Sequence, residues 1–189
     1  MLAEHDALTD LGLLYPGGNE PPPAHTAAGL ARARSVAPLD ITGNPDPNGK
    51  YVLLSIGMSN TTQEYCSAGS APPCASWSFM GQAAANPNVN GTALVLVNGA
   101  RGGQAAETWE SPGNPNYERI RNERLQPLGL SEHQVQIAWL KVANPQPTRS
   151  LPETNADAYV LERRMGNIVR TLKTRYPNLK LVFASSRIY

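Results

Sequence analysis

The chain has 189 residues, which is enough for one domain with a sizeable core and too few for two typical domains. Its 16 basic and 15 acidic residues leave a formal net charge of +1, which argues against a nucleic-acid or anionic-membrane partner. No apolar stretch approaches the roughly 18 residues that a membrane span needs, and residues 1–10 lack the apolar core of a signal peptide. We therefore expect a small neutral substrate or ligand.

The first 50 residues predict little regular structure. They contain two clusters rich in proline and glycine, YPGGNEPPPAH and GNPDPNGK, and such clusters favour turns. The sequence thus predicts an irregular arm over residues 1–50 and one α/β domain over residues 51–189.

A strand followed by a helix start surrounds Ser59. Residues 51–56 form an apolar run typical of a strand buried on both faces, and Gly57 ends it. Thr61 and Glu64 have the spacing of a capping box, so Ser59 is predicted to lie where strand becomes helix. Unpaired N–H groups at a helix start favour an anionic tetrahedral intermediate, which makes this serine a candidate nucleophile. The alternative is a structural module in which the serine only caps the helix.

The two cysteines, Cys66 and Cys74, enclose the loop SAGSAPP. The loop is short enough for a disulfide, and two unpaired thiols are the alternative. A disulfide would indicate an oxidising compartment, as for a secreted or periplasmic protein.

Further apolar runs and helical patterns alternate along the rest of the chain. This alternation predicts a three-layer α/β/α flavodoxin-like fold with a parallel sheet. Further strands are predicted over residues 93–97, 134–140 and 179–184, and helices over residues 76–85, 117–128 and 155–176. Among the tryptophans, Trp77 and Trp139 are predicted to lie in the core, whereas Trp109 could lie in the core or stack on a sugar ring.

Polar and glycine-rich residues follow three of the predicted strands. Ser59 follows the first, the segment NGARGGQ at residues 98–104 the second, and Asn144 the third. In open parallel sheets ligands bind beyond the carboxyl ends of the strands. A serine, a glycine N–H group and an asparagine amide are therefore expected to meet in one crevice.

These segments resemble three of the four sequence blocks of the SGNH (GDSL-like) hydrolase superfamily, in its carbohydrate acetylesterase-like branch. Residues 57–59 (GMS) are similar to the first block, with Met in place of the usual Asp, and residues 98–103 (NGARGG) to the second. Residues 139–144 (WLKVAN) stand where the third block is found. The third block departs from the pattern, because Val142 replaces the usual Gly and Pro145 a frequent Asp.

The resemblance implies a role for each of these groups. Ser59 would attack a carboxylic ester, such as an acetyl or carbohydrate ester, and form an acyl-enzyme. The backbone N–H groups of Ser59 and Gly103 and the side-chain amide of Asn144 would stabilise the oxyanion. No cofactor or metal is predicted, because nucleotide-binding motifs and metal-ligand spacing are absent from the sequence.

The fourth block, Asp-x-x-His, is absent from the sequence. A nucleophilic serine needs an imidazole base, yet no aspartate stands three residues before His5, His25 or His133. We therefore expect this chain to be the amino-terminal part of a longer hydrolase, with the Asp–His pair after Tyr189, and to have severely impaired activity alone. The alternative is a non-catalytic ligand- or carbohydrate-binding domain with a degenerate esterase site.

Overall fold

The computed structural model describes residues 20–67 and 72–186, and the chain divides into two units, Met1–Ser35 and Val36–Tyr189. In the first unit, helix α1 occupies Pro23–Ala33. The prediction of an irregular arm over residues 1–50 is therefore wrong for Pro23–Ala33. Proline is favourable in the first turn of a helix, where its missing N–H is not needed, and the alanine-rich segment that follows has high helix propensity.

Residues 36–50 lie in the second unit and pack against the sheet. Leu39 is buried and makes isolated antiparallel bridges within this segment. The side-chain amide of Gln136 exchanges two hydrogen bonds with the backbone of Ala37, and that of Gln134 donates to the carbonyl of Leu39. Side chains almost 100 residues away therefore hold this segment in place, which its proline and glycine content does not indicate.

The second unit contains one parallel sheet of four strands in the order β2-β1-β3-β4. The strands are β1 (Tyr51–Gly57), β2 (Leu94–Asn98), β3 (Val135–Val142) and β4 (Leu181–Ser186). Because β1 lies between β2 and β3, the carboxyl ends of these three strands are neighbours. The order reverses between β1 and β3, and such a switch point is where doubly wound sheets bind ligands.

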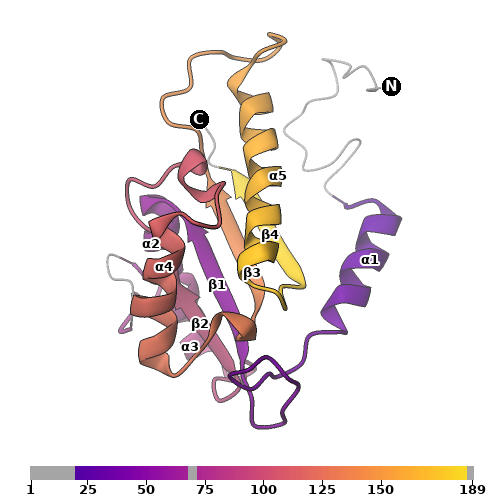
Figure 1. Cartoon of the computed structure of the whole chain (residues 1–189), viewed down its shortest axis with the longest axis vertical. Helices are drawn as coiled ribbons and strands as arrows, with labels where there is room; N and C mark the ends of the chain where they lie inside the picture. The colour runs from indigo at the N-terminus through magenta and orange to yellow at the C-terminus, as the bar shows by residue number, and fades with distance from the viewer. Residues whose placement is uncertain (1–19, 68–71, 187–189) are drawn as a thin grey trace. The chain divides into compact units, whose positions relative to one another are not determined.

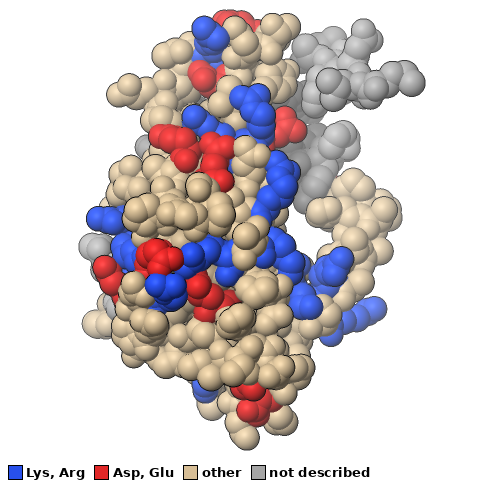
Figure 2. Space-filling model, viewed as in Figure 1, with Lys and Arg blue, Asp and Glu red and all other residues tan. Residues whose placement is uncertain are grey.

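Helices cover both faces of this sheet (Figure 1). One face carries α2 (Ser59–Cys66) and α3 (Phe79–Ala85); the other carries α4 (Pro115–Arg119), the π-helix η2 (Ile120–Leu125) and α5 (Asp157–Arg175). The short 3-10 helices are η1 (Ala106–Trp109), η3 (Gln126–Leu128) and η4 (Glu132–Gln134). This arrangement confirms the predicted three-layer α/β/α fold. Figure 2 shows acidic and basic side chains intermixed over the face formed by α4 and α5.

The larger core lies between the sheet and the α4–α5 layer. Leu54, Ile56 and Leu140 of the strands are fully buried there. Trp109 is buried with them, and its ring lies edge-to-face with that of Tyr117 at 5.6 Å between the ring centroids, so it belongs to the core. Burial of such large apolar side chains is the main stabilising contribution to the fold.

The opposite face of the sheet is partly open. Its aromatic side chains surround an apolar hollow of about 330 Å³, lined by Leu53, Tyr65, Phe79, Trp139 and Phe183. Trp139 is half-buried and stacks on Tyr65. The prediction that Trp77 lies in the core is wrong, since 60% of its surface is exposed. It lies in the turn before α3, where no described element covers it.

A disulfide joins Cys66, the last residue of α2, to Cys74, which precedes α3. This is the disulfide that the cysteine spacing allows. It links α2 to the segment that leads into α3, on the more open face of the sheet.

Removing this disulfide should lower the free energy of unfolding by about 2–3 kcal/mol, the chain-entropy value for a closed loop of this length. The variant carries Cys66→Ala and Cys74→Ala, and the measurement is urea unfolding. Reduction of the wild-type protein should give a similar loss, and reductant should have no effect on the variant. Equal unfolding midpoints for the two proteins would contradict the prediction.

Candidate functional site

Ser59 is the first residue of α2 and stands two residues after the end of β1. Its side chain is exposed. The N-cap position belongs to Met58, and no side chain caps the helix. The structure therefore does not assign Ser59 the capping role that was the alternative to a nucleophile.

The predicted capping box at Thr61 and Glu64 is wrong. The helix begins three residues earlier than this pattern implies, with Met58 and not Thr61 at the N-cap, so both side chains reach β3 instead of the helix start. The hydroxyl of Thr61 donates to the carbonyl of Lys141 at 2.7 Å. The ammonium group of Lys141 in turn binds the carboxylate of Glu64 at 2.7 Å. Both contacts tie α2 to the carboxyl end of β3.

Gly57 allows the strand, the helix and β3 to meet. A Cβ atom at this position would lie 2.2 Å from the carbonyl oxygen of Lys141 and 2.4 Å from the hydroxyl oxygen of Thr61. Both distances are far below van der Waals contact, so only glycine fits without displacement of neighbouring atoms. This close approach determines where Ser59 is placed.

The loop after β2 passes beside Ser59. The backbone N–H of Arg101 donates to the carbonyl of Gly57 at 3.0 Å, and a Cβ atom at Gly102 would lie 3.6 Å from the Cβ atom of Ser59. Gly103 follows with φ of 75°, a left-handed conformation that glycine adopts readily, and it is exposed. The structure therefore brings the predicted glycine-rich segment to the serine.

Asn144 follows β3 at the same edge of the sheet. Lys141, three residues earlier, pairs with Gly57 of β1. The N–H of Ala106 donates to the carbonyl of Ala143 at 3.0 Å, so the polypeptide after β2 also lies beside Asn144. All three predicted segments thus lie at the carboxyl ends of adjacent strands.

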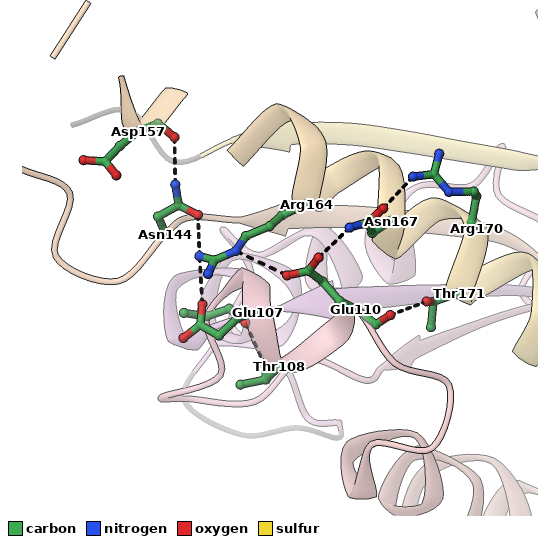
Figure 3. A network of polar contacts seen from close by, with 10 residues as sticks. Glu107, Thr108, Glu110, Asn144, Asp157, Arg164, Asn167, Arg170 and Thr171 are labelled. Atoms are coloured by element: carbon green, nitrogen blue, oxygen red, sulfur yellow. Dashed lines mark hydrogen bonds and ion pairs between the residues drawn. The ribbon is translucent and has the colours of Figure 1, made fainter. Parts of the chain in front are cut away.

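Two hydrogen bonds orient the amide of Asn144, which is buried (Figure 3). Its nitrogen donates to the carbonyl of Asp157 at 2.8 Å, and its oxygen accepts from Nη1 of Arg164 at 2.8 Å. Polarisation of the carbonyl by a guanidinium strengthens the amide N–H groups as donors.

Arg164 connects this amide to η1. Its guanidinium pairs with Glu107 at 3.4 Å and with Glu110 at 3.2 Å, and Asn167 donates to Glu110 at 2.7 Å (Figure 3). The network therefore joins α5, η1 and the end of β3. No local sequence pattern indicates Glu107, Glu110 or Arg164, because their contacts join positions 20 and 57 residues apart.

Asp157, at the start of α5, supports the same region. The backbone N–H groups of Arg149 and Thr148 donate to its carboxylate, and these bonds lower the pKa of Asp157. The negative charge also suits the amino-terminal end of a helix. The backbone carbonyl of Asp157 accepts the hydrogen bond from the side-chain amide of Asn144.

His133 lies at the opposite end of the sheet from Ser59. It belongs to η4, just before β3, whereas Lys141 at the other end of that strand pairs with Gly57. Eight residues of extended chain span about 26 Å. His25 lies on α1 in the first unit, and His5 lies outside the described residues. His133 is the only histidine of residues 36–189.

Over residues 20–67 and 72–186, no group of three or more His, Cys, Asp or Glu side chains is arranged to hold a metal ion. None of the helices described has the length and apolar character needed to span a membrane. No protein-family model, curated protein or solved structure matches the chain. A function for the chain must therefore be inferred from its own residues and their geometry.

Proposed function

We propose that the second unit is an SGNH-type serine esterase domain that acts on carboxylic esters, such as acetyl or carbohydrate esters. The observation that carries this proposal is the position of Ser59. Its side chain is exposed at the start of α2, a helix without a side-chain cap, and Gly102 of the neighbouring loop lies against it. The buried Oδ1 atom of Asn60 has no hydrogen-bond partner among the described residues. An unsatisfied buried polar atom beside the serine is consistent with a site that binds a further group.

In this mechanism, Oγ of Ser59 attacks the ester carbonyl carbon and loses its proton to a base. The tetrahedral intermediate then expels the alcohol, which takes up the proton, and water releases the acid from the acyl-enzyme. We assign stabilisation of the oxyanion to the N–H groups of Ser59 and Gly103 and to the amide of Asn144. The first N–H groups of a helix have no intrahelical acceptor, so α2 is suited to this task.

The alternative is a non-catalytic ligand- or carbohydrate-binding domain. The distance of His133 from Ser59 favours it, because no other histidine is present in residues 36–189. In that case the crevice would still bind a ligand, and Ser59 would not react. We also propose, from the Cys66–Cys74 disulfide, that the protein is secreted or periplasmic, because disulfides persist in oxidising compartments.

Labelling with a fluorophosphonate probe, with and without added imidazole, distinguishes the esterase proposal from the binding-domain alternative. Free imidazole can replace an absent general base, so it should accelerate modification of Ser59 by at least about tenfold in a saturable manner. Ser59→Ala should abolish the modification. Ser76→Ala, at an exposed serine before α3, should leave it unchanged. Mass spectrometry of the labelled peptide identifies the modified residue.

Hydrolysis of p-nitrophenyl acetate by the same proteins gives a second measurement, with the rate of Ser59→Ala subtracted as background. If the folded protein remains unlabelled at Ser59 in saturating imidazole, the esterase proposal is wrong and the binding-domain alternative is favoured.

A further inference from the structure

A polar hollow, distinct from the apolar one under α2 and α3, lies beside Ser59. Its volume is about 360 Å³, and its lining includes Thr62, Arg101, Gly102, Arg119, Glu123 and Arg124. Gly102 is the residue whose backbone lies against Ser59, and Thr62 is one helical turn from Ser59 on α2. The hollow therefore adjoins the candidate nucleophile.

Positive charge dominates this hollow. It brings together three guanidinium groups and one carboxylate, from the loop after β2, the end of α4 and the π-helix η2. No ion pair of Arg101, Arg119 or Arg124 occurs among the described residues. Glu123 is thus near these arginines without forming an ion pair with any of them.

Two of these guanidinium groups have unsatisfied donors. The Nε atoms of Arg119 and Arg124 are buried and make no hydrogen bond within the described part of the chain. Nη2 of Arg119 donates to the carbonyl of Gly99 at 2.5 Å, which places this guanidinium at the base of the loop after β2. A buried donor without an acceptor costs roughly 1–3 kcal/mol, and the described residues do not offset this cost for either guanidinium.

Arg175 shows how the chain surrounds an arginine that has a structural role. Its guanidinium pairs with Glu118 at 2.8 Å and with Glu132 at 2.7 Å. Burial lowers the pKa of Arg175, and the bonds to these two carboxylates outweigh burial and raise it. Its Nη2 atom, like the Nε atoms of Arg119 and Arg124, makes no hydrogen bond among the described residues, so the difference between these arginines lies in their ion pairs. The pKa of Arg119, in contrast, is lowered by burial and by the charges of Arg124 and Arg101. The charge of Glu123 only partly opposes this lowering, and Arg119 forms none of the ion pairs that stabilise the guanidinium of Arg175.

The π-helix η2 contributes to this arrangement. It carries both Glu123 and Arg124 and follows directly after Arg119. A π turn interrupts the regular hydrogen-bond pattern of an α-helix, and such turns are frequent at functional sites.

We propose that this hollow binds an oxyanion, a carboxylate, sulfate or phosphate carried by a small polar ligand, through Arg101, Arg119 and Arg124. The planar guanidinium fork matches such groups and forms charge-assisted hydrogen bonds with them. The volume lies at the lower end of the range for small-molecule sites. A further step rests on the proposed function: the ester substrate then carries a negative charge next to its scissile bond. Binding of the oxyanion itself does not depend on that step.

Titration calorimetry of the whole chain at constant ionic strength tests this proposal. The probes are glucuronate, neutral glucose, inorganic phosphate and sulfate. We expect saturable binding of at least one of the three anions and no binding of glucose. Glucuronate binding identifies a carboxylate, whereas binding of phosphate or sulfate alone identifies a tetrahedral oxyanion.

Variants that remove either a positive or a negative charge from the hollow should change the affinity in opposite directions, which makes the test specific. Arg101→Gln and Arg124→Gln should each weaken binding by at least about tenfold, and Glu123→Gln should strengthen it by several-fold, because the bound anion no longer faces a carboxylate. Arg163→Gln, at an exposed arginine of α5, makes the same change of charge outside the hollow and should alter the affinity by less than about twofold. If Arg124→Gln does not fold, Glu123→Gln provides the test.

Ser59→Ala should bind the anion as the wild-type protein does, so failure of the esterase and failure of this proposal give different results. The proposal is overturned if none of the three anions binds saturably. It is also overturned if Arg163→Gln weakens binding as much as Arg124→Gln, because binding would then be non-specific.

Discussion

Replacement of Gly57 by alanine should lower the free energy of unfolding by about 3 kcal/mol or more. The added Cβ atom would lie 2.2 Å from the carbonyl oxygen of Lys141, which belongs to the neighbouring strand. Relief of this overlap requires β1 and β3 to separate at their carboxyl ends. Since Thr61 also contacts this position and anchors α2, the helix start should move with it.

Urea unfolding measures this effect, with Gly91→Ala as the matched control. A Cβ atom at Gly91 would meet no atom within 4 Å, so its substitution should change stability by less than about 0.5 kcal/mol. A domain of this kind is stable by only about 5–15 kcal/mol, so the Gly57 variant should lose a large part of its stability. An unfolding midpoint equal to that of the control would show that the strands do not approach each other this closely.

Replacement of Asn144 by alanine should slow the imidazole-assisted reaction of Ser59 with the fluorophosphonate by about 10²–10³-fold, the usual effect of removing one oxyanion donor. The substitution also deprives Arg164 and the carbonyl of Asp157 of a partner. This loss should reduce stability by about 1–3 kcal/mol. The measurements are the labelling rate and urea unfolding of the same preparations.

Asn167→Ala is the control for this prediction. Asn167 belongs to the same network but binds Glu110, at the other side of Arg164. We expect this variant to lose a similar amount of stability and to keep its labelling rate within about threefold. If both variants slow the reaction equally, Asn144 acts only through the structure, and its role as an oxyanion donor is wrong.

Local patterns in the sequence identify most of the sheet and the longest helix. The apolar run at residues 51–56 corresponds to β1, and the pattern predicted over residues 155–176 corresponds to α5 at Asp157–Arg175. Both predictions depend on the spacing of apolar residues within one element. That spacing reflects burial against a single surface, so the sequence contains it directly.

The α4 region shows the limit of such patterns. The charged segment at residues 117–128 is helical and ends before Gly129, which has φ of 68° as a helix-ending glycine should. Its division into α4, the π-helix η2 and the 3-10 helix η3 has no signal in the apolar spacing. The π turn instead accompanies the approach of Arg119 and Arg124 to the loop after β2.

Sequence patterns predict the α/β class, the position of Ser59 between a strand and a helix, and the polar segments after three strands. No such pattern predicts that Thr61 binds Lys141, that Asn144 is oriented by Arg164, or that three arginines meet beside Ser59. The difference arises from the separation in sequence of the residues that meet. Strand and helix patterns arise within one element, whereas the bonds of Thr61 to Lys141 and of Arg164 to Asn144 join residues 80 and 20 positions apart in different elements. These bonds, and the meeting of the loop after β2 with α4 and η2, form only when the sheet has assembled.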